Sequence, residues 1–111
     1  MRNEIMEGQT YKITTGCGNA YVTINSIGDK PHEVFINIGK TGGCVSSQAE
    51  STGRLLSVAL QAGVCIEKLA KQLKGIRCQN QIVNGKPVLS CADAVGQCLE
   101  MHQKGGLNGN K

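Results

Sequence analysis

The sequence has few aromatic residues and no long apolar run. Of its 111 residues none is tryptophan, and two tyrosines and one phenylalanine are the only aromatic side chains. A hydrophobic core must therefore be built from isoleucine, leucine, valine and alanine. No segment approaches the roughly 18 consecutive apolar residues that predict a membrane-spanning helix. The charged N-terminus also lacks the apolar region of a secretion signal.

The sequence also lacks a strong excess of charge. Twelve lysines and arginines against eight carboxylates give a formal net charge of +4, and the basic residues are scattered. Proteins that bind nucleic acid usually carry a basic stripe, and binders of single strands add aromatic platforms for stacking. The composition therefore disfavours nucleic acid as a partner. It is compatible with a small anionic ligand.

The six cysteines include no Cys-x2-Cys pair, the spacing by which zinc sites usually show themselves. In a secreted protein six cysteines would predict three disulfides. Because no secretion signal precedes them, we expect reduced thiols and a cytoplasmic protein.

The length is that of one domain. We expect a polar lead-in at residues 1–9, a single domain at residues 10–103 and a flexible tail at residues 104–111.

The first part of the domain has the period-two pattern of β-strands. Apolar and polar residues alternate at 11–15 and 21–25, and residues 33–38 form a third extended segment. Short turns join them, which predicts an antiparallel meander. Two later segments, at 76–83 and 87–89, flank an Asn-Gly turn signal and predict one or two further strands.

The period changes after the third strand and predicts a long helix. Ser47 and Glu50 have the spacing of a capping box. Leu55, Leu56 and Leu60 follow at helical spacing with Thr52 and Ala59, and Gly63 is a suitable stop.

Two more helices are predicted. One covers residues 66–73 and ends before Gly75, and Ser90 caps the other with Asp93 in its first turn. The predicted fold is α+β: a small antiparallel sheet (three-stranded meander plus one or two later strands) covered on one face by about three helices.

A glycine-rich turn is the first candidate for ligand binding. A complete phosphate-binding loop would need a glycine at position 34, where valine stands, so this turn is not a Walker motif. Free N–H groups at the following helix start still favour an anion, and guanidinium groups fit phosphate well. The candidate residues are Gly39, Lys40, Thr41, Gly42, Gly43, Arg54 and Arg77. The alternative is an ordinary strand-to-helix turn with solvated arginines.

Cysteines form the second candidate site. Cys17, Cys78 and Cys91 stand at the ends of predicted elements and could meet around a metal ion such as zinc. Alternatively they pack as small hydrophobic residues, as we expect for Cys65 and Cys98 at helical core positions. Cys91 at a helix start is expected to have a lowered pKa. No histidine lies near it in the sequence, so no catalytic activity is predicted.

Several motifs follow one another in the order of a known family. They are Gln9-Thr-Tyr-Lys-Ile, Thr15-Gly-Cys-Gly-Asn, Tyr21-Val-Thr-Ile, Glu33-Val-Phe-Ile, Ile38-Gly-Lys, Gly53-Arg-Leu-Leu-Ser, Gln72-Leu-Lys-Gly-Ile-Arg-Cys and Ser90-Cys-Ala-Asp. With them the chain resembles the TSCPD domain, a small domain near the C-terminus of adenosylcobalamin-dependent ribonucleotide reductases. Ala92 replaces the proline of the naming motif. In those enzymes the domain lies outside the catalytic barrel, so the resemblance implies an accessory module without reductase activity.

The expected function is therefore non-enzymatic binding of a small ligand by a homo-oligomer, since a short sheet leaves a face or edge to be protected. We expect a phosphorylated nucleotide that is sensed or sequestered, by analogy with phage proteins that sequester the nucleotide signals of bacterial immunity. The alternative is a metal-stabilised accessory or interaction module, with zinc at Cys17, Cys78 and Cys91, that acts with a ribonucleotide reductase.

Overall fold

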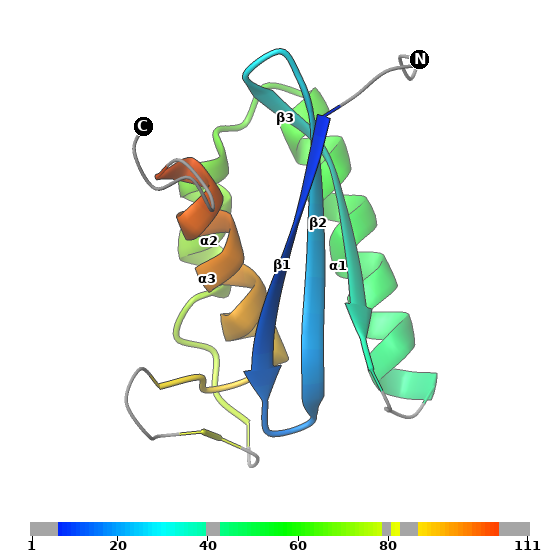
Figure 1. Ribbon diagram of the computed structural model, residues 1–111, viewed down its shortest axis with the longest axis vertical. Helices are drawn as coiled ribbons and strands as arrows, with labels where there is room; N and C mark the ends of the chain where they lie inside the picture. Colours follow the sequence, from blue (N-terminus) through cyan, green and yellow to red (C-terminus); the bar gives the residue numbers. More distant parts are fainter. Residues whose placement is uncertain (1–6, 40–42, 79–80, 83–86, 105–111) are drawn as a thin grey trace.

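In the part of the chain that the structure describes, three strands form one sheet (Figure 1). The computed structural model describes residues 7–39, 43–78, 81–82 and 87–104. The strands are β1 (Glu7–Thr15), β2 (Gly18–Ile27) and β3 (Lys30–Ile38), paired antiparallel in the order β1-β2-β3. Tyr11 lies opposite Val22, and Val22 lies opposite Ile36. The predicted meander is confirmed, and β1 begins inside the expected lead-in because polar residues 7–9 also join the ladder.

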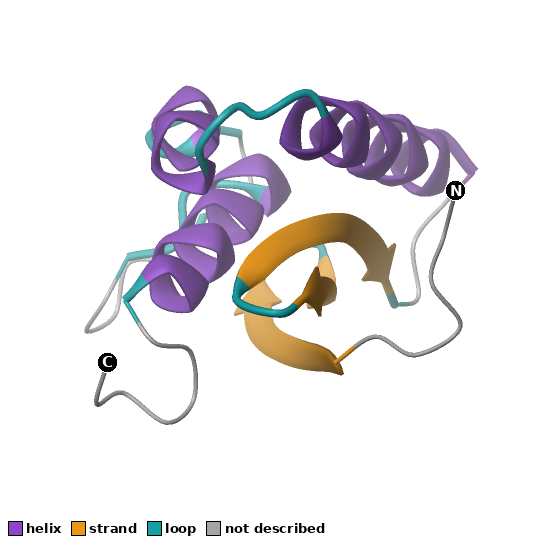
Figure 2. Ribbon diagram, turned by 90° about the horizontal axis from the view of Figure 1, so that it is seen from above, coloured by secondary structure: helices purple, strands orange, loops and turns teal. Residues whose placement is uncertain are grey.

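Three helices lie on one side of this sheet (Figure 2). They are α1 (Gly43–Gln61), α2 (Ile66–Leu73) and α3 (Cys91–Gln103). Helix α1 packs along β3, α3 packs on β1 and β2, and α2 packs mainly on α3. The α+β architecture with helices on one face is confirmed.

The predicted later strands do not form in the described part of the chain. Residues 81–82 and 87–88 contribute a single antiparallel bridge, in which Ile82 and Val88 exchange two backbone hydrogen bonds of 2.9 and 2.7 Å. Nearby backbone groups bond to side chains instead: the Ser90 hydroxyl donates to Ile76 O at 2.6 Å. The segment is therefore anchored to α3 rather than added to the sheet.

Helix α1 differs from its prediction at its start and on its buried side. It begins at Gly43, and Ser47 lies inside the helix, where its hydroxyl donates to Gly43 O. Leu55 was expected to face the core but is 71% exposed. The core side of α1 is formed by Gly53, Leu56 and Leu60, because a glycine at 53 lets the helix backbone approach β3 closely: a Cβ there would lie 3.0 Å from Val34 O.

The core consists of aliphatic side chains from the sheet and the inner faces of the helices. Its buried residues are Tyr11, Ala20, Val22, Ile24, Val34, Ile38, Leu56, Leu60, Ile66, Ala70, Val88, Ala94, Val95, Cys98 and Leu99. Tyr11 is the only aromatic residue among them. Its hydroxyl lies 2.8 Å from His102 Nδ1 and donates to Gln9 Oε1 at 2.7 Å, which links β1 to the last turn of α3.

The Tyr11–His102 contact predicts a pH-dependent stability. Burial lowers the pKa of His102 below 6.5, the ordinary value for histidine. The folded state then binds fewer protons than the unfolded chain, so stability is fully present above about pH 6.5 and is lost as the pH falls below it. Urea unfolding curves at several pH values should show this loss in the wild type and in His32→Gln. They should show a smaller loss of stability in His102→Gln. An unchanged loss in this variant would contradict the assignment of the pH dependence to His102.

Candidate functional site

A pocket lies between the first half of α1 and the start of α3, over the end of β3. Its volume is about 380 Å³. It is lined by Cys17, Ile36, Ile38, Cys44, Val45, Gln48, Ala49, Thr52, Ile76, Arg77, Cys78, Ser90, Cys91, Ala92 and Val95. Most of these side chains are apolar, and the volume lies within the range typical of small-molecule sites.

Four of the six cysteines line this pocket. Cys17 comes from the turn between β1 and β2, Cys44 from the first turn of α1, Cys78 from the segment after α2, and Cys91 is the first residue of α3. Thr15 Oγ1 lies 3.6 Å from Cys91 Sγ. The structure thus brings together the three cysteines named from the sequence and adds Cys44, which sequence reasoning missed. The only sequence signal for Cys44 is its position at the start of a helix, after two glycines.

The pKa of Cys91 is raised, contrary to the expectation from its position at a helix start. The largest cause is desolvation by burial. A hydrogen bond with Thr15 opposes the shift, and the neighbouring thiols of Cys17 and Cys78 add to it. The prediction of a lowered pKa for Cys91 was therefore wrong, because burial disfavours the charged thiolate. At neutral pH the protonated thiol is the main form.

The four thiols share a pocket without surrounding one point. Within residues 7–39, 43–78, 81–82 and 87–104, no group of three or more histidine, cysteine or acidic side chains is placed to hold a metal ion as it stands. A metal would require side-chain rotations of the cysteines.

The residues expected to bind phosphate lie in separate places where the structure describes them. Lys40, Thr41 and Gly42 lie outside the described residues. The N–H of Gly39 already donates to Asn19 O at 3.0 Å. Gly43 is the first residue of α1.

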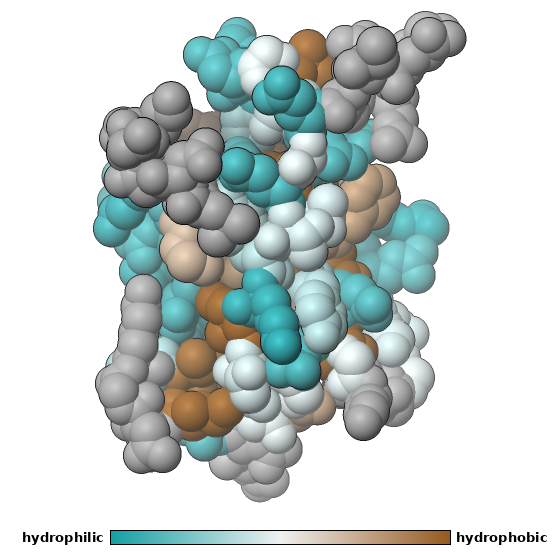
Figure 3. Space-filling model, viewed as in Figure 1, coloured by the Kyte–Doolittle hydropathy of each residue, from teal (hydrophilic) through white to brown (hydrophobic). Residues whose placement is uncertain are grey.

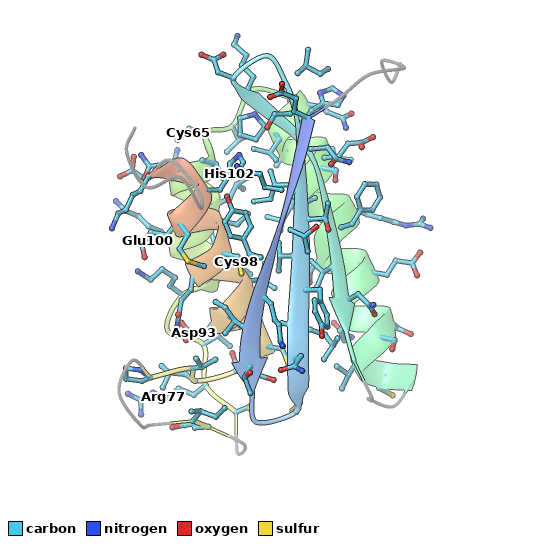
Figure 4. The ribbon with its side chains drawn as sticks, viewed as in Figure 1. Cys65, Arg77, Asp93, Cys98, Glu100 and His102 are labelled. Atoms are coloured by element: carbon cyan, nitrogen blue, oxygen red, sulfur yellow. The ribbon has the colours of Figure 1, made fainter. Side chains whose placement is uncertain are left out.

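The two arginines of the predicted site lie in different hollows. Arg77 belongs to the segment that follows α2 and lines the pocket that contains the four thiols (Figure 4). Arg54 lies eleven residues after Gly43, about 16 Å along the helix axis, in a hollow between α1 and β3. It forms an exposed ion pair with Glu50 at 2.7 Å. Of the predicted residues that the structure describes, Arg54 and Arg77 therefore do not share one site.

The remaining cysteines divide between core and surface. Cys98 is fully buried, as expected, and burial raises its pKa to about 12. Cys65 was expected to be buried but is exposed. It precedes α2 with extended backbone, at φ −75° and ψ 146°, so its side chain does not follow the helical spacing on which the prediction depended.

Fold and site together define the class of this protein: it is an α+β domain with a pocket lined by thiols. The chain belongs to the TSCPD domain family, whose model matches residues 2–103. No curated protein and no solved structure matches the chain. Among the described helices none has the length and hydropathy to cross a membrane.

Proposed function

We propose that this protein is a non-enzymatic accessory module whose pocket thiols bind a thiophilic metal ion, zinc in the first place. The observation that carries this proposal is that Cys17, Cys44, Cys78 and Cys91, from four separate segments, line a single pocket. Thiolates are preferred ligands of zinc, and four of them complete its usual tetrahedral shell in structural sites. The family supports an accessory role, and a ribonucleotide reductase is the partner that we propose.

The surroundings of the thiols fit this role better than catalysis. A raised pKa makes Cys91 a poor nucleophile, but a bound metal deprotonates a coordinating thiol outright. Metal uptake should therefore release protons and weaken as the pH falls. A bound ion would tie the hairpin turn, α1, the segment after α2 and α3 to one another, and so would stabilise the folded state.

Metal content after purification under reducing conditions tests the proposal. We expect about one zinc per chain by elemental mass spectrometry, as in structural sites, and a lower melting temperature after chelation. Cys91→Ser should remove the zinc, and Cys44→Ser should weaken its binding at least several-fold. Cys65→Ser is the matched control, because Cys65 is exposed and does not line the pocket. If the folded protein takes up no zinc on reconstitution, the proposal is wrong.

A second candidate function, binding of a phosphorylated nucleotide, is favoured by the size of the same pocket. Its apolar walls would accept a base, and the exposed Arg77 on its lining would meet the phosphate. Native mass spectrometry of untreated protein should then show a nucleotide mass. Arg77→Ala should weaken its binding, and Arg54→Ala in the other hollow is the control. Sequestration of a nucleotide signal, by analogy with phage proteins, and sensing of it both require this one site.

A further inference from the structure

The outer edge of β1 carries backbone groups without a partner in the sheet. Val34 N donates to Ser57 Oγ at 2.9 Å, so the hydrogen-bonding groups of Val34 point away from β2. Residues opposite one another in an antiparallel ladder share the same direction of bonding. Ile24, opposite Val34, must therefore bond to β1, and its partner there is Gln9. Alternation along β1 leaves four residues with N–H and C=O groups that point outward: Gly8, Thr10, Lys12 and Thr14.

The two edges of the sheet differ in how they are covered. Along β3, Ser57 bonds to the backbone of Val34, and Gln61 Nε2 donates to His32 O at 3.1 Å. Helix α1 thus occupies that edge. Along β1, the four outward residues are exposed. No backbone hydrogen bond joins their outward groups to any other described segment.

We propose that the β1 edge pairs with the β1 edge of a second copy of this chain, antiparallel, with Thr10 on the twofold axis. A twofold axis makes the same strand available from both copies, and the outward N–H groups of Gly8, Thr10 and Lys12 then meet C=O groups of the second copy, while the position opposite Thr14 lies outside the described residues. The two sheets become one continuous sheet of six strands. The polar open face of the sheet, over which pale and teal residues run in Figure 3, continues across the axis.

Lys12 disfavours two neighbouring registers. With the axis at Lys12 the two lysines would be opposite one another, and with the axis at Tyr11 they would be diagonal neighbours, where like charges repel. With the axis at Thr10, Lys12 of each copy lies opposite Gly8 of the other. The lysines are then well separated.

The surroundings of Gly8 complement the incoming lysine. Asn25 lies opposite Gly8, and its Oδ1 occupies the place where a Cβ of residue 8 would be. Asn25 Nδ2 donates to Glu33 Oε1 at 3.2 Å, which leaves Oδ1 as an acceptor beside a carboxylate. A lysine ammonium that arrives over Gly8 thus meets an oxygen acceptor and a negative charge. This match identifies a second copy, rather than an arbitrary extended peptide, as the occupant.

Proline at position 10 tests the pairing. Thr10→Pro removes an outward N–H but no bond between β1 and β2, whereas Thr10→Ala keeps the N–H and is the matched control. Both lose the side-chain hydrogen bond between Thr10 and Thr23. By light scattering on a sizing column, the wild type and Thr10→Ala should be dimers, and Thr10→Pro a monomer with an unchanged circular dichroism spectrum.

Two further variants keep the proposal testable if Thr10→Pro does not fold. Thr10→Lys leaves the backbone intact and places like charges together at the axis, so it should be monomeric. Lys12→Ala and Asn25→Ala should each raise the dimer Kd several-fold, and the double variant should raise it no further than either alone. A monomeric wild type overturns the proposal. So does a dimer that persists in Thr10→Lys.

Discussion

Replacing Asp93 with alanine is expected to lower the free energy of unfolding by about 3–5 kcal/mol. This carboxylate is 4% exposed and accepts three hydrogen bonds. They come from Gly75 N at 2.8 Å, Leu89 N at 3.0 Å and Gln97 Nε2 at 2.8 Å. Alanine would leave two backbone donors and one amide without this acceptor at the point where the end of α2 and the start of α3 meet.

Urea unfolding followed by circular dichroism measures this effect, since the chain has no tryptophan to report by fluorescence. Asp93→Asn keeps the shape and one acceptor oxygen, so it should lose about half as much stability. Glu67→Ala is the matched control: it removes an acidic residue from the first turn of α2, where the side chain is exposed, and should change stability by less than about 0.5 kcal/mol. If Asp93→Ala lowers the free energy of unfolding no more than the control does, the result would contradict a stabilising role for the three hydrogen bonds of Asp93.

Gly96→Ala is expected to destabilise the protein by about 1–3 kcal/mol, although alanine is the better helix former. Gly96 lies in the middle of α3 at its crossing with the end of α2. A Cβ at this position would lie 2.9 Å from Lys74 N and 3.1 Å from Ala70 O. Because these are backbone atoms, the helices must separate to admit a methyl group, and the packing of α2 on α3 is lost in part.

The control for Gly96 is a glycine in a helix with free space around it. A Cβ at Gly43, the first residue of α1, would meet no atom within 4 Å. Gly43→Ala should therefore be neutral or slightly stabilising in thermal unfolding. If both substitutions raise the melting temperature, the result would contradict the close packing of α2 against α3 at Gly96.

Elements defined by local signals could be predicted from the sequence. Helix α2 has the predicted bounds, and Gly75 after it adopts φ +89°, a conformation that glycine tolerates best. Ser90 caps α3 as predicted and accepts from Asp93 N at 2.9 Å. The three strands of the meander were placed correctly because alternation of apolar residues decides which face is buried, whereas the later segments have no such alternation to decide their pairing.

Features that depend on contacts between distant segments could not be predicted. The buried side of α1 follows from its approach to β3 at Gly53, and local spacing alone favoured Leu55. The meeting of Cys17, Cys78 and Cys91 was expected as one alternative from their places at element ends, but the addition of Cys44 depends on how α1 packs against the rest of the domain. For the same reason the raised pKa of Cys91 could not be inferred, since burial is a property of the assembled pocket.

The residues just before and at the start of α3 also hydrogen-bond to the backbone around Cys78. Cys78 N donates to Leu89 O at 3.0 Å, and the Ser90 hydroxyl holds Ile76 O. Cys78 and Leu89, which are separated in the sequence, are therefore held next to each other. Since lengthening a segment whose ends are fixed costs little, about 0.6 kcal/mol for each doubling, we expect a peptide tag to be tolerated between residues 82 and 88, which the bridge of Ile82 and Val88 holds together. We expect such an insertion to leave the pocket thiols in place, because the backbone hydrogen bond of Cys78 to Leu89 lies outside it.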